Sequence, residues 1–136
     1  MDPIVSYKAF QINKSYSDVV YDSSIWISDF NFIKNELFFL KTVIKSNAFK
    51  ATIPNLFERL QLLVKDINRL NEDVNLIKEK IEKYKYKVTE TINSDVFSFS
   101  EDYFEGYKSL GKEIFEFDQK YKNFKMHLYE FLIEIF

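Results

Sequence analysis

Residues 103–135 read YFEGYKSLGKEIFEFDQKYKNFKMHLYEFLIEI, and apolar or aromatic residues recur along them in alternating steps of four and three. A period of 3.5 residues keeps one seam of a helix turned toward a partner, which is typical of coiled-coil packing. The stretch therefore predicts a long helix over residues 101–136. Its seam consists of Tyr103, Tyr107, Leu110, Ile114, Phe117, Tyr121, Phe124, Leu128, Phe131 and Ile135.

The same repeat occurs in the middle of the chain and predicts a second helix over residues 54–92. Pro54 stands just inside the expected start, where its missing N–H costs no helical hydrogen bond. The seam residues are Leu56, Leu60, Leu63, Ile67, Leu70, Val74, Ile77, Ile81, Tyr84 and Val88.

A third repeat near the N-terminus predicts a helix over residues 3–47, with Asp2 as its N-cap and Pro3 in its first position. The alternative is a break near residues 22–24, because residues 13–24 are rich in Ser and Asp, which disfavour helix interiors. The seam would run through Val5, Ala9, Ile12, Tyr16, Val19, Ser23, Trp26, Phe30, Ile33, Leu37, Leu40 and Ile44.

The two links between these segments, residues 46–53 and 93–100, are short enough to make consecutive helices antiparallel neighbours. We therefore expect an all-α fold, one antiparallel three-helix bundle over residues 1–136, coiled-coil-like and similar in layout to a spectrin repeat. Pairing every seam residue sets Leu56 opposite Ile135. It also places Trp26 in one layer with Val74 and Phe117, and it brings together Tyr16, Tyr84 and Tyr107.

Composition limits the classes of function. The chain of 136 residues is 46% hydrophobic and 29% charged, with only 2 Gly and 2 Pro, which leaves few turns for a β-rich fold. The absence of Cys removes disulfides, thiol catalysis and thiolate metal sites. A net charge of -2 gives no basic field, so we expect no specific nucleic-acid partner.

No transmembrane segment is expected either. The most apolar stretch, residues 25–44, carries Asp29, Lys34, Glu36 and Lys41, and four charges disfavour a membrane span. The start of the chain shows no signal-peptide pattern, so we expect a cytoplasmic protein.

Enzyme chemistry has few candidate residues. His127 is the single histidine, and Glu130 follows it by three positions, the reverse of the Glu-x-x-His order that helical di-iron sites use. The seams contain no carboxylates. We therefore expect no enzyme, no cofactor and no metal site.

A set of apolar residues lies off the seams of the first and third helices and predicts an interaction surface at one end of the bundle. We expect a protein partner or a homo-oligomer there. The alternative function is a sensor or carrier that holds a small apolar ligand among the rings of Trp26, Phe117, Tyr121 and Phe124. The expected interface residues are Ile25, Phe32, Phe38, Phe39, Met126, Tyr129, Ile133 and Phe136.

One stretch of the first predicted helix carries a resemblance to known proteins. It reads Trp26-Ile27-Ser28-Asp29-Phe30, followed by Phe32 and Glu36-Leu37-Phe38-Phe39-Leu40. This stretch resembles the opening of small uncharacterised helical proteins of Bacteroidetes-type bacteria, which continue into a long coiled-coil hairpin. The resemblance implies a bacterial helical bundle. It implies no known activity, so it identifies no functional residues in this chain.

Overall fold

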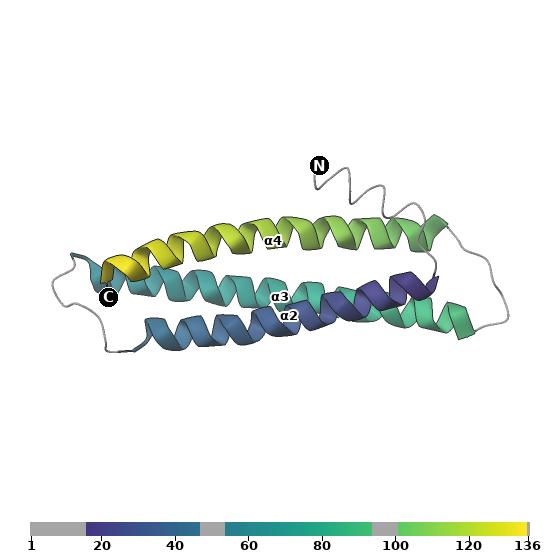
Figure 1. Cartoon of the computed structure of the whole chain (residues 1–136), viewed down its shortest axis with the longest axis horizontal. Coiled ribbons are helices and arrows are strands. Elements are labelled where there is room, and N and C mark those ends of the chain that lie inside the picture. Colours follow the sequence, from purple (N-terminus) through teal and green to yellow (C-terminus); the bar gives the residue numbers. More distant parts are fainter. Residues whose placement is uncertain (1–15, 47–53, 94–100, 136) are drawn as a thin grey trace.

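Three long helices make up the computed structural model, which describes residues 16–46, 54–93 and 101–135 (Figure 1). The helices lie side by side along the long axis of the molecule. The described residues contain no strand. The prediction of an all-α antiparallel three-helix bundle is therefore confirmed.

The helices are α2 (Tyr16–Ile44), α3 (Leu56–Asn93) and α4 (Glu101–Ile135). The chain runs along α2, returns along α3 and turns again into α4, so α2 and α4 point the same way (Figure 1). This arrangement places α3 antiparallel to both of its neighbours.

The helix that begins at Leu56 starts two residues later than the sequence predicts. Asn55 has a φ angle of 55°, in the left-handed region that a right-handed helix cannot include and that Asn tolerates better than most residues. The carbonyl of Asn55 accepts a hydrogen bond from the Arg59 N–H at 3.0 Å, which begins the helical ladder.

The predicted weak point of the first helix does not break it. The hydroxyl of Ser23 donates to the Val19 carbonyl at 2.8 Å, and that of Ser24 donates to the Val20 carbonyl at 3.1 Å. These bonds satisfy the serines inside the helix, so α2 continues through them even where Ser23 is fully buried. The predicted extension over residues 3–15, with Asp2 and Pro3, lies outside the described residues, and α2 ends at Ile44 rather than residue 47.

Seam residues from all three helices form the core of the described part, with Leu60, Leu63 and Phe124 only partly buried against it. Between α3 and α4 the observed register lies within two residues of the predicted one. The prediction sets Lys80 opposite Gly111, and the observed partner of Lys80 is Glu113, at 2.9 Å. Asp73 and Lys120, also 2.9 Å apart, form a second cross-link in the same register. The most deeply buried seam residues include Phe30, Leu37, Ile67, Val74, Ile81, Val88, Tyr107, Leu128 and Ile135.

The predicted layer of Trp26 with Phe117 is wrong, because α2 is displaced along α4. The Trp26 ring stacks on Tyr107 at 5.3 Å between centroids, and Phe30 lies beside Phe117 at 5.3 Å. The hydroxyl of Tyr107 also donates to Asp22 at 2.7 Å. A shift of nearly one heptad keeps the seams facing each other, so periodicity alone does not specify this register.

The three tyrosines predicted to share a layer lie in one cluster near the start of α2, but the displacement of α2 sets Tyr107 beside Asp22 and Trp26 rather than level with Tyr16. Tyr16, Tyr84 and Tyr107 belong to one cluster that also holds Val19 and Val88. The cluster therefore combines large rings with small β-branched side chains, which fill the space between the rings.

Candidate interaction surface

The structure exposes seven of the eight residues that the sequence assigns to an interaction surface. Their exposed fractions range from 41% for Ile25 to 79% for Ile133. The side chain of Phe136 lies outside the described part. The other five are Phe32, Phe38, Phe39, Met126 and Tyr129.

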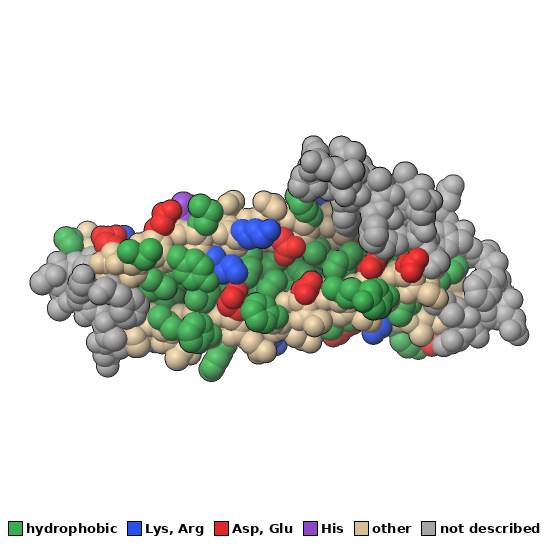
Figure 2. Space-filling view, viewed as in Figure 1, with side chains coloured by type: hydrophobic (Ala, Val, Ile, Leu, Met, Phe, Trp, Pro, Cys, Tyr) green, Lys and Arg blue, Asp and Glu red, His purple; other side chains and the backbone are tan. Residues whose placement is uncertain are grey.

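Three of these residues follow one edge of α2, the edge that borders α4. Glu36 marks this edge because it accepts hydrogen bonds from Tyr121 and Lys125 of α4. Phe32 and Phe39 lie four residues before and three residues after Glu36, so they share its side of the helix. Ile25 lies seven residues before Phe32 and continues the same edge. In Figure 2, hydrophobic side chains gather between α2 and α4 on this side of the molecule.

Tyr129 extends the apolar surface on α4, four residues after Lys125 and thus on the same side of that helix. Met126 and Ile133 lie three residues before and four residues after Tyr129, so they form one stripe with it. We call the surface formed by Ile25, Phe32, Phe39 and Tyr129, together with the polar groups between them, the α2–α4 face.

Phe38 does not join this face. It lies three residues before Lys41, whose ammonium donates to Asn68 of α3 at 2.9 Å, so Phe38 borders α3 instead. Ile25 and Phe32 lie nearer the middle of α2 than its end. The exposed apolar residues therefore form a line along the bundle rather than the single end patch that the sequence predicts.

A polar group at the centre of the α2–α4 face ties the two helices together. The Tyr121 hydroxyl donates to the Glu36 carboxylate, and the Lys125 ammonium donates to the same oxygen at 3.0 Å while lying 4.7 Å from the Tyr121 ring centroid. Burial alone would raise the pKa of Glu36, but the two hydrogen bonds and the charge of Lys125 hold that pKa below its usual range. Burial and the Glu36 carboxylate raise the pKa of Tyr121, which therefore acts as a donor.

A second polar feature of the face, the carboxylates of Asp29 and Asp118, destabilises the isolated chain. Burial raises the pKa of Asp118 on α4, the Lys122 charge lowers it, and the Asp29 carboxylate of α2 raises it further. Among the described residues, neither Asp29 nor Asp118 has a hydrogen bond or ion pair with another side chain. Asp29 lies three residues before Phe32 and thus on the same side of α2. The repulsion between the Asp29 and Asp118 carboxylates therefore occurs among the apolar residues of the face.

The proximity of Asp29 to Asp118 could not be predicted from the sequence, because it depends on the displaced register of α2. The predicted interface also omits several exposed apolar residues. These lie on other sides of the bundle or near its ends, and they are Tyr21, Phe57, Leu62, Leu76 and Tyr86.

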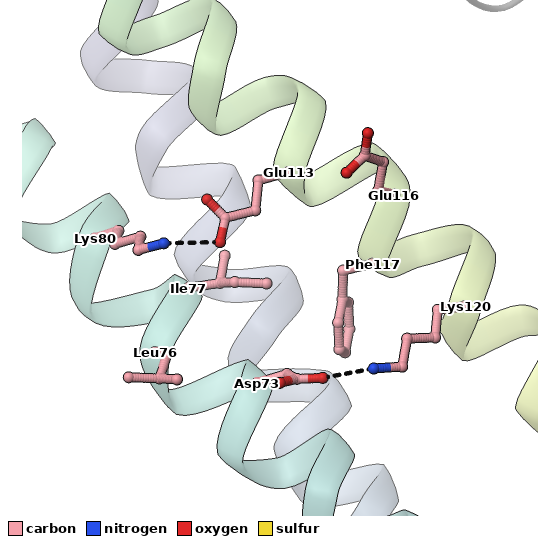
Figure 3. A pocket seen from close by; sticks show the side chains of 8 residues that line it. All are labelled: Asp73, Leu76, Ile77, Lys80, Glu113, Glu116, Phe117 and Lys120. Carbon is pink, nitrogen blue, oxygen red and sulfur yellow. Dashed lines mark hydrogen bonds and ion pairs between the residues drawn. The ribbon is translucent and has the colours of Figure 1, made fainter.

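The opposite side of α4, where it meets α3, has a shallow hollow of about 440 Å³ (Figure 3). Ile77 and Phe117 form its floor, and the Lys80–Glu113 and Asp73–Lys120 ion pairs cross it. Because both pairs are already formed, the rim offers a ligand few free charges. The hollow is open at the surface and reaches the core only at its floor, where Ile77 and Phe117 lie.

The alternative of an apolar ligand inside the bundle needs space among the core rings. Phe117 contacts both Phe30, at 5.3 Å, and Tyr121, at 5.9 Å between centroids, so these rings pack on one another. A larger hollow of about 770 Å³ lies at the surface between the end of α2 and the start of α3. The geometry of the described core therefore does not favour this alternative.

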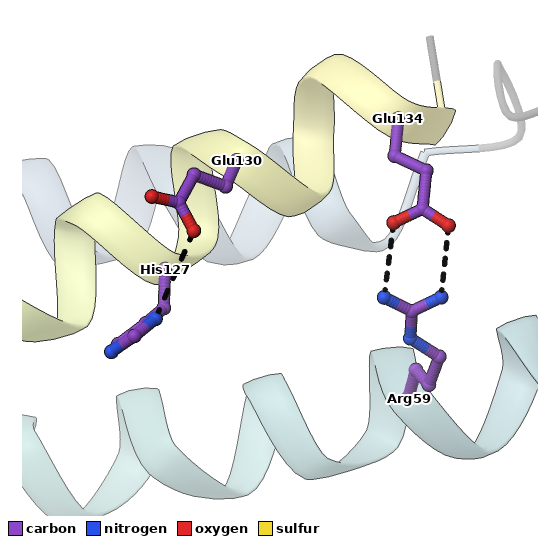
Figure 4. A network of polar contacts seen from close by, with 4 residues as sticks. All are labelled: Arg59, His127, Glu130 and Glu134. Carbon is purple, nitrogen blue, oxygen red and sulfur yellow. Dashed lines mark hydrogen bonds and ion pairs between the residues drawn. The ribbon is translucent and has the colours of Figure 1, made fainter.

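The single histidine lies on the surface of α4, with its ring 4.0 Å from Glu130 and its side chain 81% exposed (Figure 4). One turn further, Arg59 of α3 binds Glu134 through two hydrogen bonds of 3.3 and 3.2 Å, and its guanidinium covers the Phe131 ring. The described residues contain no cluster of three or more His, Cys, Asp or Glu side chains suited to a metal ion. In the described ranges, no helix has an apolar run of the length that a membrane crossing requires.

Comparisons of the chain with protein-family models, curated proteins and solved structures each find no match.

Proposed function

We propose that this protein is a non-enzymatic protein–protein interaction module that self-associates through the α2–α4 face. The observation that carries the proposal is the line of large, exposed apolar side chains at Ile25, Phe32, Phe39 and Tyr129. Large apolar side chains that gather on one face of a protein commonly mark an interface.

Covering the face would be energetically favourable. Burial of one Phe side chain contributes about 1.5–3 kcal/mol, and a two-fold symmetric dimer buries each such residue twice. Phe32 is 64% exposed and Phe39 is 62% exposed, so most of this contribution is still available. The rigid helices beneath both rings mean that little backbone order has to be gained on binding.

Light scattering over a range of protein concentrations tests the proposal. We expect the parent chain to show a mass above that of one copy as concentration rises. The double variant Phe32→Asp with Phe39→Asp should stay monomeric, because it would bury four carboxylates in each dimer.

The matched control is Leu62→Asp with Leu76→Asp on α3. These leucines are 61% and 58% exposed, close to the values for the two phenylalanines, but they lie off the α2–α4 face. The control should associate like the parent. A parent that is monomeric at every concentration, or a control that dissociates as readily as the test variant, contradicts the proposal.

The cytoplasmic location that the sequence favours is part of the same proposal. Fractionation of cells that express the protein tests it, since recovery in a membrane or secreted fraction would contradict it.

A further inference from the structure

The α2–α4 face carries an electrostatic cost at Asp118 that Lys122 of the same chain relieves only in part. Asp118 is half-buried on α4 and feels the repulsion of the exposed Asp29 carboxylate on α2, while the Lys122 charge offsets this repulsion without forming an ion pair among the described residues. Covering charged carboxylates with an apolar partner would strand them away from water, which costs far more than burying the neighbouring rings gains. The occupant of this face therefore has to bring a cation to this point.

The same face supplies a suitable cation. Lys122 lies four residues after Asp118 on α4, so both side chains lie on one side of that helix, and Lys122 is exposed. Lys125, the next lysine on this side, is already bound to Glu36 at 3.0 Å. A second copy of the chain would thus carry both a carboxylate and an exposed ammonium one helical turn apart.

The position of the apolar residues agrees with this charge pattern. Glu36, which lies between Phe32 and Phe39 on α2, is hydrogen-bonded to Tyr121, which lies between Asp118 and Lys122 on α4. The midpoint of the phenylalanine pair and the midpoint of the charged pair are therefore level along the bundle. One two-fold axis through that level relates both pairs at once.

From this coincidence we infer that the occupant of the α2–α4 face is a second copy of the chain, docked antiparallel about a two-fold axis beside the Glu36–Tyr121 contact. Asp118 of each copy then meets Lys122 of the other, and Phe32 of each copy meets Phe39 of the other. Such an interface is self-complementary, as two-fold symmetry requires. The inference rests on the proposed self-association and specifies its geometry.

Charge reversal tests this geometry, with sedimentation equilibrium as the measurement. Asp118→Lys alone and Lys122→Asp alone each place like charges across the two-fold axis. The association constant of each variant should fall at least about tenfold. An equimolar mixture of the two variants restores opposite charges at both contacts and should associate about as tightly as the parent.

The control uses the pair Lys112 and Glu116, also four residues apart on α4 but off the face, with side chains 78% and 64% exposed. Glu116→Lys and Lys112→Asp change the net charge by the same amounts and should leave association unchanged. Circular dichroism shows whether each variant still folds.

The outcomes separate the inference from the proposed function. If the parent associates but the single reversals do not weaken it, or the mixture does not restore it, the antiparallel geometry is wrong and self-association stands. If the parent stays monomeric, both are wrong. Loss of association in the Glu116 and Lys112 controls would show a general charge effect and would also overturn the geometry.

Discussion

The Tyr121 hydroxyl of α4 donates a hydrogen bond to the Glu36 carboxylate of α2, and this bond fixes how the two parallel helices are aligned. Lys125 binds the same carboxylate oxygen at 3.0 Å. The α2–α4 pairing therefore has a charge-assisted polar contact at its centre, in addition to the stacked rings beneath it.

Removal of the Tyr121 hydroxyl should weaken the fold. Tyr121→Phe keeps the ring against Phe117 but deletes the donor, so Glu36 keeps only Lys125. We expect the free energy of unfolding to fall by about 1 kcal/mol. Urea denaturation of dilute protein measures this, and an unchanged midpoint would show that the bond contributes nothing.

Acid should weaken the contribution of Glu36. Because hydrogen bonds and the Lys125 charge hold its pKa below 4.5 in the folded chain, the ionised form stabilises the fold above about that pH. The contribution is lost as the pH falls through the folded-state pKa. The stability difference between the parent and Glu36→Gln should therefore be largest at neutral pH and shrink in acid. A difference that grows below pH 4.5 would contradict this sign.

Asp118 should show the opposite behaviour. Its pKa is raised above 3.8 by burial and by Asp29, so its ionised form destabilises the folded monomer at neutral pH. Asp118→Asn should stabilise dilute, monomeric protein by a few tenths of a kcal/mol at pH 7, since the site is partly exposed. The gain should vanish once the pH falls below 3.8, and thermal unfolding at both pH values measures it.

Gly106 permits the close approach of α3 and α4. A Cβ atom at this position would lie 2.9 Å from Cε2 of the Tyr84 ring. Gly106→Ala should therefore destabilise the fold by about 1 kcal/mol although Ala favours helices. In a Tyr84→Ala background the same substitution should become stabilising, and chemical denaturation of the four variants shows whether the sign reverses.

Much of the fold follows from the sequence because three seams repeat every 3.5 residues and two short links join them. The α3–α4 register also follows, since both helices have long, fully apolar seams that leave few pairings. The alignment of α2 does not follow. A slip of nearly one heptad preserves its seam, and the choice depends on hydroxyl acceptors at Asp22 and Glu36 that no repeat reveals.

The candidate face could be predicted in part, because periodicity shows which residues lie off the seams but not how α2 is aligned with α4. Phe32 and Phe39 are exposed because they lie off the seam, which periodicity shows directly. Their alignment with Asp118 and Lys122 requires the observed position of α2 on α4. The repulsion between Asp29 and Asp118 also depends on that position and could not be read from spacing within either helix.

Aromatic NMR spectra of the unmodified chain over a concentration series test the central claim most directly, because they report the covered surface without any substitution. We predict that the ring signals of Phe32 and Phe39 shift and broaden as concentration rises. Those of Phe57 and Tyr86, which are 68% and 66% exposed on α3, should stay constant. Concentration-dependent shifts at Phe57 and Tyr86 with none at Phe32 and Phe39 would contradict the account.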